Sequence, residues 1–376
     1  MNEHAAASAT QPKDRFLWNH WYSAGFPEEF GRHLLARTFL GENVVLFRRE
    51  DGTPVAFEDR CAHRRLPLSM GRLKGDTVEC GYHGVTYDAQ GKCVAIPGEK
   101  KVPAGAGVRA FPVLERHGYW WIWLGDAGLA DPNRIPDYSR IVDKDWASTR
   151  IALHLECNYL LTVDNLLDLS HLPYVHGTTT GNPPVAEDAS VRVERSGDRV
   201  QVKRWARNVE PAPTFIEFGG YNDRIDIWQV SEFNPPSYVR VSYGSAPAGT
   251  GIPEGDGFWT QGNWGFQVYH GIVPETERTT HQFRYVVHPR GFADKEVLKE
   301  FYRQCDQIIR EDLAVFAIQQ RALDAEGASA WQPNARIAIN ADGGLLQARA
   351  ITQKLLAAER SRGVGAGGSL SRSRSD

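Results

Sequence analysis

Alternating apolar and polar positions predict β-strands in both halves of the chain. In the first half, residues 44–49 and 55–59 flank a turn that contains Gly52, which is typical of a β-hairpin, and residues 120–124 form a strongly apolar strand. In the second half, short alternating segments separated by turn residues predict an antiparallel sheet. Its strands are expected at residues 192–194, 200–204, 224–230, 238–243, 266–273 and 279–287.

Two longer segments, residues 158–172 and 293–320, have the apolar spacing of amphipathic helices. The apolar stripe of the second helix comprises Leu298, Phe301, Cys305, Ile308, Ile309, Val315 and Phe316. Strands alone in the first part of the chain, and strands with helices in the second, predict an α+β protein. We expect an all-β domain over residues 15–135. A second domain over residues 136–362 should have an antiparallel sheet covered by helices in the helix-grip manner.

Composition and charge exclude several classes of protein. The 376 residues suffice for two domains with full cores. A formal net charge of −3 argues against nucleic-acid binding, and no apolar run approaches the length of a membrane span. The N-terminus lacks the apolar segment of a secretory signal, and five unevenly spaced cysteines favour a reducing compartment, so we expect a cytoplasmic protein. The polar ends, residues 1–14 and 363–376, are expected to be disordered.

The strongest chemical signal is a pair of cysteine–histidine motifs. Cys61 and His63 are followed, after sixteen residues, by Cys80 and His83, which gives the pattern C-x-H-x16-C-x2-H. This arrangement is typical of a Rieske [2Fe–2S] centre, in which the cysteines hold one iron and the histidines the other. Zinc is the alternative, but structural zinc sites favour closely spaced pairs of cysteines. Imidazole ligands raise the reduction potential to within about −150 to +300 mV, so such a cluster can pass on single electrons.

A second group of polar residues lies between residues 164 and 176. Asn165, Asp168 and His171 share one face of the predicted helix, and His176 follows after Pro173. In a straight helix the two imidazoles would diverge by roughly 140°. Because proline cannot continue a regular helix, we expect a bend between the two histidines that lets both rings reach one metal ion. The alternative is that both histidines are structural residues near a helix end.

A carboxylate that could complete a metal site lies on the predicted helix over residues 293–320. The helical period places Asp312 on the apolar stripe, where a buried carboxylate must be paired, protonated or metal-bound. Its neighbour Glu311 projects away and is expected to be solvated. Two imidazoles and one carboxylate form the facial triad of non-haem Fe(II) oxygenases, which leaves other positions open for O₂ and water. The alternative is that Asp312 pairs with an arginine.

Together these motifs resemble the oxygenase component of Rieske non-haem iron aromatic oxygenases. The resemblance runs from about Trp18 to Leu356. Within that family the chain is similar to the branch that contains vanillate O-demethylase, dicamba monooxygenase and toluenesulfonate methyl-monooxygenase. Local similarities occur at residues 163–168, 244–251, 274–277 and 310–312. The second cluster loop departs from the family, since it reads Cys-Gly-Tyr-His-Gly-Val where Cys-Pro-Tyr-His-Gly-Trp is frequent.

The resemblance implies two iron cofactors. One [2Fe–2S] cluster would be held by the cysteines and histidines of the two motifs, Cys61, His63, Cys80 and His83. One mononuclear Fe(II) would be held by the triad, His171, His176 and Asp312. Electrons would come from NAD(P)H through a separate partner, either a flavin and iron–sulfur reductase or a ferredoxin.

The resemblance also implies an assembly and further site residues. Such oxygenases are usually homotrimers, because the cluster and the iron of one subunit lie too far apart. Asp168 matches the aspartate that links the partner subunit's His83 to the iron ligand His171, and Asn165 is a second catalytic candidate. His270 occupies the position of a substrate-facing histidine in dicamba-type relatives, although a structural strand histidine is the alternative.

The function expected from this resemblance is that of the terminal oxygenase in a multicomponent monooxygenase. With O₂ it would oxidise a small aromatic acid, and removal of the methyl group of a methoxybenzoate as formaldehyde is the reaction we expect. One alternative is hydroxylation or dihydroxylation of another aromatic or alicyclic substrate. An alternative of another class is an electron-transfer protein that uses the cluster alone. Residues 245–257, rich in Gly and Pro, are a candidate lid over a substrate pocket.

Overall fold

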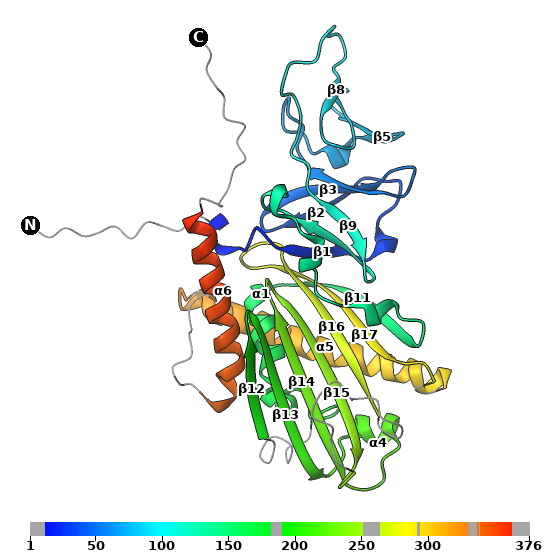
Figure 1. Cartoon of the computed structure of the whole chain (residues 1–376), viewed down its shortest axis with the longest axis vertical. Coiled ribbons are helices and arrows are strands. Elements are labelled where there is room, and N and C mark those ends of the chain that lie inside the picture. The colour runs from blue at the N-terminus through cyan, green and yellow to red at the C-terminus, as the bar shows by residue number, and fades with distance from the viewer. Residues whose placement is uncertain are drawn as a thin grey trace, which may run out of the picture.

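The structure is a computed structural model of the whole chain. Figure 1 shows a region of small sheets at one end of the molecule and one large sheet with helices at the other. No helix among the described residues is long and apolar enough to cross a membrane. The structure describes residues 12–181, 190–250, 264–291, 294–328, 330, 337 and 339–362.

The N-terminal region is built from short antiparallel strands. Among the described residues they form three sheets, with the strand orders β1-β10-β9, β2-β3-β4 and β5-β6-β7-β8. The predicted hairpin is β3 and β4, and the predicted apolar strand is β10, in which every residue is buried. The strands are β1 (Trp21–Gly25), β2 (Leu35–Phe39), β3 (Glu42–Arg48), β4 (Pro54–Glu58), β5 (Arg72–Lys74), β6 (Thr77–Glu79), β7 (Thr86–Tyr87), β8 (Cys93–Ala95), β9 (Val113–Arg116) and β10 (Tyr119–Trp123).

The second region of the described chain contains a seven-stranded antiparallel sheet, with the order β11-β17-β16-β15-β14-β13-β12. The predicted segments fall in β12 to β17. Strand β11 is not among the expected strands, although Ile151, Leu153 and Leu155 alternate with more polar residues; it is an edge strand that pairs with β17 alone and has no fully buried residue before Leu155. The strands are β11 (Trp146–Leu155), β12 (Ser190–Ser196), β13 (Arg199–Val209), β14 (Ile225–Asn234), β15 (Tyr238–Pro247), β16 (Trp264–Pro274) and β17 (Thr280–Pro289).

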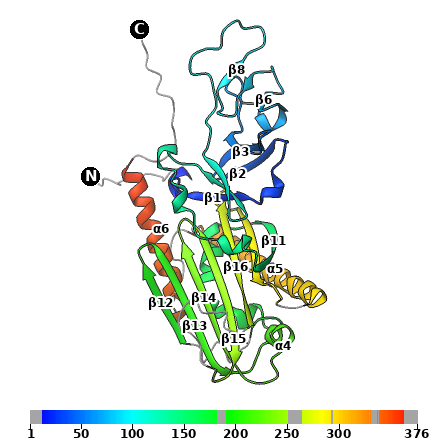
Figure 2. The same cartoon turned by 45° about the vertical axis from the view of Figure 1, so that its right-hand side comes forward.

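Helices pack on the large sheet and along its edge. The buried side of α5 packs on β14 and β16, and α6 packs on β13 near the β12 edge (Figure 1; Figure 2). The α-helices are α1 (Tyr159–Leu167), α2 (Leu172–Val175), α4 (Pro213–Gly219), α5 (Lys295–Ala325) and α6 (Gly343–Ser361). The 3₁₀-helices are η1 (Pro12–Arg15), η2 (Pro27–Glu29), η3 (Leu68–Met70), η4 (Ala127–Leu129), η5 (Pro132–Arg134), η6 (Ser139–Val142), η7 (Leu169–His171) and η8 (Asn340–Asp342).

The long predicted helix is confirmed as α5, with later bounds than expected. Asp294 begins it, because its Oδ1 accepts hydrogen bonds from the N–H groups of Glu296 and Val297 at 3.0 Å each. Val315 departs from the predicted stripe, since the helical turn carries it to the surface, where it is 39% exposed. The buried face consists of Phe301, Cys305, Ile309, Asp312, Phe316 and Gln320.

The helix predicted over residues 158–172 ends early, at Leu167. The carboxylate of Asp168 accepts hydrogen bonds from the N–H and the hydroxyl of Ser170 at 2.9 and 2.6 Å, a local turn that competes with the helix. The chain then continues through η7 into α2, where Pro173 lies in the first turn and is tolerated. The break therefore falls at Asp168, and the expectation that Pro173 causes it is wrong.

One hydrophobic core joins the two regions. It includes Trp21 and Trp121 from the N-terminal sheets and Tyr238 and Phe283 from the large sheet. The hydroxyl of Tyr238 also donates a hydrogen bond to the carbonyl of Trp21 at 2.5 Å. The N-terminal region is therefore packed tightly on the large sheet. The predicted boundary between residues 135 and 136 falls in the connection from β10 to β11 and stays a prediction.

Helix α6, which has no counterpart among the expected elements, ties the start of the chain to α1. The buried carboxylate of Glu359 accepts hydrogen bonds from the N–H groups of Trp18 and Asn19 at 2.8 and 3.0 Å. Nearly three turns earlier on α6, Nε of Arg349 donates to Asp164 of α1 at 2.9 Å. These contacts fix α1, which precedes the predicted metal ligands, relative to the N-terminal region.

The last residues of the predicted N-terminal tail, 12–14, belong to a described 3₁₀-helix. Residues 12–15 form η1, and the carbonyl of Asp14 accepts a hydrogen bond from Nη2 of Arg360 at 2.6 Å. The contact with α6 orders these residues, which composition alone does not reveal. Residues 1–11 and the predicted tail over residues 363–376 lie outside the described residues.

Candidate cluster and metal sites

The two cysteine–histidine motifs fold into loops with the same backbone geometry. In each loop the cysteine N–H donates to the carbonyl five residues later, at 2.9 Å for Cys61 and 2.8 Å for Cys80. The N–H of the residue four positions after each cysteine, Arg65 or Gly84, donates to the carbonyl of that cysteine. Both residues have a positive φ, +63° at Arg65 and +71° at Gly84. Gly84 is required, because a Cβ there would lie 2.9 Å from Pro97. Both loops therefore turn sharply and present their histidines outward.

The cysteines of the two motifs are buried thiols with hydrogen-bond donors around them. Each is 2% exposed, and the structure has no disulfide among the described residues, which include all the cysteines. Burial raises the pKa of Cys80, and the backbone N–H groups of Tyr82 and His83 partly offset this. The Sγ of Cys61 lies 3.2 Å from the hydroxyl of Tyr87. Such donors stabilise thiolate ligands and help to set the reduction potential of a cluster.

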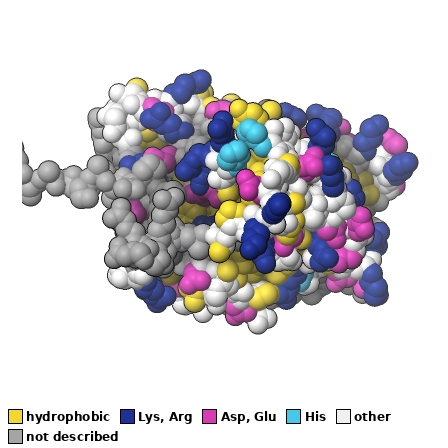
Figure 3. Space-filling model, turned by 90° about the horizontal axis from the view of Figure 1, so that it is seen from above, with side chains coloured by type: hydrophobic (Ala, Val, Ile, Leu, Met, Phe, Trp, Pro, Cys, Tyr) yellow, Lys and Arg dark blue, Asp and Glu magenta, His cyan; other side chains and the backbone are white. Residues whose placement is uncertain are grey.

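The histidines of the two motifs lie at the exposed end of the N-terminal region. The rings of His63 and His83 are exposed, and their centroids are 4.6 Å apart. Exposed Tyr82 lies beside His83, at 3.8 Å between ring centroids. Figure 3 looks onto this end and shows histidine side chains at the surface, near apolar and basic ones. Buried sulfurs and exposed imidazoles fit a [2Fe–2S] cluster whose histidine side is open to another protein.

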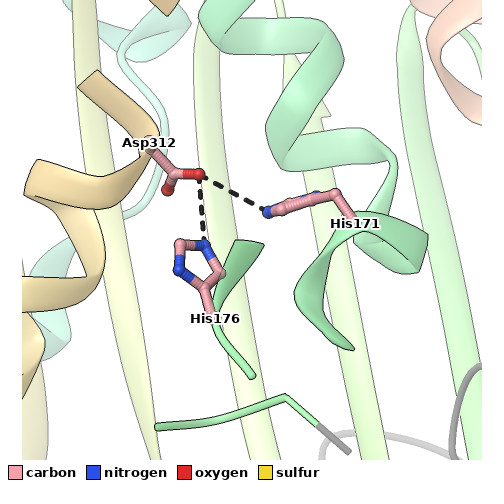
Figure 4. Close-up of side chains that lie close together, drawn as sticks. All are labelled: His171, His176 and Asp312. Atoms are coloured by element: carbon pink, nitrogen blue, oxygen red, sulfur yellow. Dashed lines mark hydrogen bonds and ion pairs between the residues drawn. The ribbon is translucent and has the colours of Figure 1, made fainter. Parts of the chain in front are cut away.

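The residues predicted to bind the mononuclear iron converge in the second region. His171 and His176 flank α2, and Asp312 lies on the buried face of α5 (Figure 4). The Oδ1 atom of Asp312 lies 3.1 Å from Nε2 of His176 and 3.6 Å from Nε2 of His171. One ligand atom from each residue lies within 4.8 Å of the others. Among the described residues Asp312 pairs with no arginine, so that alternative is wrong.

Hydrogen bonds turn both imidazoles toward this point. Nδ1 of His171 lies 2.5 Å from the backbone carbonyl of Asp168, and Nδ1 of His176 lies 2.7 Å from Oε2 of Glu311. Carbonyl and carboxylate oxygens are acceptors, so Nδ1 of each ring carries a proton, and Nε2 of each ring is the atom that would bind a metal ion. Metal-binding histidines are arranged in this way. The residues therefore fit a mononuclear metal ion with two nitrogen ligands and one oxygen ligand.

Glu311 contradicts the prediction that it is solvated. Adjacent residues of a helix diverge by about 100°, but the side chain of Glu311 reaches His176, and Nε2 of Gln307 donates to its Oε1 at 3.0 Å. Burial alone would lower the pKa of His176, but the hydrogen bonds and charges of Asp312 and Glu311 outweigh it and raise that pKa. Helical periodicity could not reveal this contact, because it depends on a distant segment.

The two predicted catalytic residues border the three ligands in different ways. Nδ2 of Asn165 donates to Oδ1 of Asp312 at 3.3 Å. Asp168 contacts His171 through its backbone carbonyl, whereas its carboxylate accepts from Ser170. In this single chain, the hydrogen bond to His171 is thus made by the backbone carbonyl of Asp168 and not, as predicted, by its carboxylate. Its half-buried carboxylate keeps lone pairs for a further donor.

His270 lies inside the large sheet, on β16, and is 3% exposed. The side-chain amide of Gln282 donates to its Nδ1 at 2.8 Å. Burial, and then the charge of Arg284, hold the pKa of His270 well below its usual value, so the ring is neutral. Of the predicted lid, residues 245–247 belong to β15, and residues 251–257 lie outside the described residues.

Comparison with known proteins identifies both regions. Residues 20–112 match the Rieske [2Fe-2S] domain, and residues 155–358 match the vanillate O-demethylase oxygenase C-terminal domain. The chain is 38% identical over 346 residues to a putative toluene-4-sulfonate monooxygenase system iron-sulfur subunit of Comamonas testosteroni, covering 91% of this chain and 97% of that protein. It is 33% identical over 353 residues to the vanillate O-demethylase oxygenase subunit of Pseudomonas sp. (strain HR199 / DSM 7063), covering 92% and 96%.

The chain belongs to the Rieske non-haem iron oxygenases. This oxygenase also matches the crystal structure of dicamba monooxygenase bound to 3,6-dichlorosalicylic acid, with a TM-score of 0.83 and 31% identity over 93% of this chain and all of that one. A further dicamba monooxygenase structure, with a TM-score of 0.76 and 29% identity over 93% of this chain and 99% of that one, contains non-haem iron and dicamba. The oxygenase therefore uses a Rieske [2Fe–2S] cluster and a non-haem iron. Membership excludes a zinc module and a cluster-only electron carrier.

We predict that Glu311→Ala weakens metal binding at the triad by about 10-fold, because His176 loses the acceptor that orients it. Equilibrium dialysis of Co(II), with the iron removed and the cluster kept intact, measures this affinity. Glu311→Gln keeps an acceptor but not the charge, so its metal affinity should lie between those of Glu311→Ala and the wild type. Glu300→Gln is the matched control, since Glu300 is on the same helix and pairs with Arg303 at the surface. Equal affinities of the Ala variant and the wild type would contradict an orienting role.

Proposed function

We propose that this oxygenase oxidises a small aromatic acid and that its reaction is O-demethylation of a methoxybenzoate. The observation that carries the proposal is the convergence of His171, His176 and Asp312, of which the last two are buried. Two histidines and one carboxylate on one side of an iron leave positions open for O₂, which suits oxidation of a C–H bond. Relatives named for O-demethylation of vanillate and dicamba support the choice of reaction.

The proposed ligands of the two iron cofactors come from the two cysteine–histidine loops and from the triad. We propose that the cluster belongs to a domain over residues 15–135 and the iron to one over residues 136–362. When bound, the cluster supplies single electrons, and the iron supplies the place where O₂ is reduced and the substrate is oxidised. The proposed cluster ligands are Cys61, His63, Cys80 and His83. The proposed iron ligands are His171, His176 and Asp312.

The net reaction balances with two electrons from NAD(P)H and two protons. One oxygen atom of O₂ enters a C–H bond of the methoxy group, and the other is released as water. The hydroxylated methoxy group is a hemiacetal, which breaks between its carbon and the aryl oxygen to give a phenol and formaldehyde. Ring or methyl hydroxylation uses the same electron balance and is the second candidate, supported by the relative named for toluene-4-sulfonate.

Residues of the chain hold these parts in place. The carbonyl of Asp168 and the carboxylate of Glu311 orient the two imidazoles, and Nδ2 of Asn165 orients the carboxylate of Asp312. Buried Leu167 and Leu172 lie on either side of the helix break at Asp168 and shield this part of the site from bulk water. The role proposed for Asn165 is thus to position a ligand.

We propose a homotrimer in which electrons cross between subunits. In support, His63 and His83 are exposed in the N-terminal region, whereas the triad lies at α2 and α5 of the second region. The small sheets and the large sheet lie at opposite ends of the molecule (Figure 1). An exposed imidazole can reach the half-buried carboxylate of Asp168 on a partner subunit. A flavin and iron–sulfur reductase or a ferredoxin would deliver the electrons to the cluster. A supply of NAD(P)H and free thiols suits the cytoplasm.

Asp168→Asn tests the electron path between subunits. We predict that turnover falls at least about 10-fold while cluster and iron contents are unchanged, because the amide carries no negative charge and has an NH₂ donor in place of one acceptor oxygen. The rate of iron-dependent cluster oxidation in a single turnover measures the step. Asp145→Asn, an exposed residue before β11, is the control and should behave as the wild type. Near-normal turnover of Asp168→Asn would rule out the relay.

A substrate panel tests the reaction itself. Purified oxygenase with a surrogate reductase and NADH would be offered methoxybenzoates, methylbenzoates, arylsulfonates and phthalates, while O₂ uptake and formaldehyde are followed together. We predict that formaldehyde matches O₂ uptake on a methoxybenzoate. Substrate-dependent O₂ uptake without formaldehyde would refute demethylation and favour hydroxylation. If no compound of the panel stimulates O₂ uptake, the proposal that the substrate is an aromatic acid is refuted.

A further inference from the structure

The face of the large sheet that packs on α5 carries a buried arginine. Arg284, on β17, is 5% exposed. It pairs in register with His270 on β16, so the two side chains lie side by side on the same face. Its Nη1 donates a hydrogen bond to the carbonyl of Cys305 on α5 at 2.9 Å. Arg284 therefore lies between the sheet and the helix that carries Asp312.

Arg284 has no counter-charge among the described residues. Within that part of the chain no carboxylate lies at ion-pair distance from it, and its Nε has no hydrogen-bond partner. Two other shielded arginines differ, since Arg240 pairs with Glu232 at 3.3 Å and Arg349 pairs with Asp164 at 2.5 Å. A guanidinium stays charged at ordinary pH, and a buried charge requires a partner. The surroundings of Arg284 are therefore suited to an anion that comes from outside the described residues.

The titratable groups beside Arg284 are neutral. Burial and then Arg284 hold the pKa of His270 well below its usual value, and Gln282 donates to its Nδ1, so the proton of His270 is on Nε2. Burial raises the pKa of the Cys305 thiol to about 11, which Arg284 partly offsets. Burial also raises the pKa of Tyr243 on β15. These neighbours supply donors and apolar surface but no negative charge.

The distance from Arg284 to the triad suits one aromatic ring. Cys305, which holds Arg284, and Asp312 are on the same face of α5, seven residues apart, which corresponds to about 10 Å along the helix axis. Tyr243 interacts with the charges of both Asp312 and Arg284. It is half-buried and lies on the same side of the sheet as Arg284 and His270, the side that packs on the helix that carries Asp312. A ring with an anion on Arg284 would therefore have its opposite end near the triad.

We propose that Arg284 binds the acid group of the substrate, an aryl carboxylate or sulfonate, beside His270, whose substrate-facing position the family resemblance already implies. This inference rests on the proposed function and names the end of the substrate that is not oxidised. Guanidinium N–H groups match the geometry of an oxyanion and form charge-assisted hydrogen bonds with it. A neutral aromatic would leave the guanidinium buried and unpaired, so the site selects acids.

Pairs of acids and neutral analogues test the site on the full-length enzyme with both cofactors. Isothermal titration would measure the binding of 4-methoxybenzoate, its methyl ester and 4-toluenesulfonate. The proteins are wild type, Arg284→Met, which removes the charge, and Arg284→Lys, which keeps it. Arg240→Met is the matched control, because Arg240 is on the opposite face of the same sheet. Cluster and iron contents are measured for every variant.

We expect wild type and the Arg240→Met control to bind an acid at least about 10-fold more tightly than the ester, as a charge-assisted hydrogen bond provides. Arg284→Met should lose this preference with its affinity for the ester unchanged, and Arg284→Lys should recover part of it. Binding of 4-methoxybenzoate or of 4-toluenesulfonate identifies the acid as carboxylate or sulfonate. Unchanged acid binding in Arg284→Met, or an equal loss for acid and ester, would overturn the proposal.

Two further outcomes keep the test decisive. If Arg284→Met does not fold, wild type alone decides, because an ester bound as tightly as the acid overturns the proposal. If acids bind through Arg284 but no methoxybenzoate yields formaldehyde, the anion site stands and the proposed demethylation fails. If formaldehyde forms equally well from acid and ester, demethylation stands and the anion site is wrong.

Discussion

A carboxylate buried between two imidazoles is the constraint on which the rest of this structure depends. Asp312 is 5% exposed, and its charge is tolerated inside the protein only beside groups that compensate it. Its Oδ1 lies 3.1 Å from Nε2 of His176, 3.6 Å from Nε2 of His171 and 3.3 Å from Nδ2 of Asn165. A divalent metal ion satisfies the carboxylate and both ring nitrogens together, because the Nδ1 atoms are already engaged elsewhere.

The fold meets this constraint by joining segments that are far apart in sequence. The turn at Asp168 stops α1 and lets both histidines face α5, and α5 delivers Asp312 from its buried face. Helix α6 fixes α1 through Arg349 and fixes the start of the chain through Glu359. The cluster loops are thus held at one end of a single packed unit. This is why the proposed electron path runs between subunits and why Asp168, beside the triad and half-buried, is its proposed receiver.

The parts of the site that depend on local sequence could be predicted, and those that depend on long-range contacts could not. Cys61, His63, Cys80 and His83 belong to two short loops, so their spacing alone predicts the cluster. Asp312 could be predicted from helical periodicity, because a carboxylate on an apolar stripe is buried and must be paired, protonated or metal-bound. Glu311 could not be predicted, since its partner His176 is 135 residues away. Helix α6 also escapes prediction, because it has no strongly apolar face, whereas the alternation of Ile151, Leu153 and Leu155 is a signal for β11. Arg284 had a signal, a charge inside an apolar strand, whose meaning required the position of α5.

The iron content of the wild type and of Asp312→Ala tests the central claim most directly. The account predicts about three irons per wild-type chain, two in a [2Fe–2S] cluster and one at the triad. Asp312→Ala should keep the absorption and electron paramagnetic resonance signals of the cluster and lose the mononuclear iron alone. A variant that keeps the mononuclear iron, or a wild type that binds only the cluster when iron is in excess, would contradict the account.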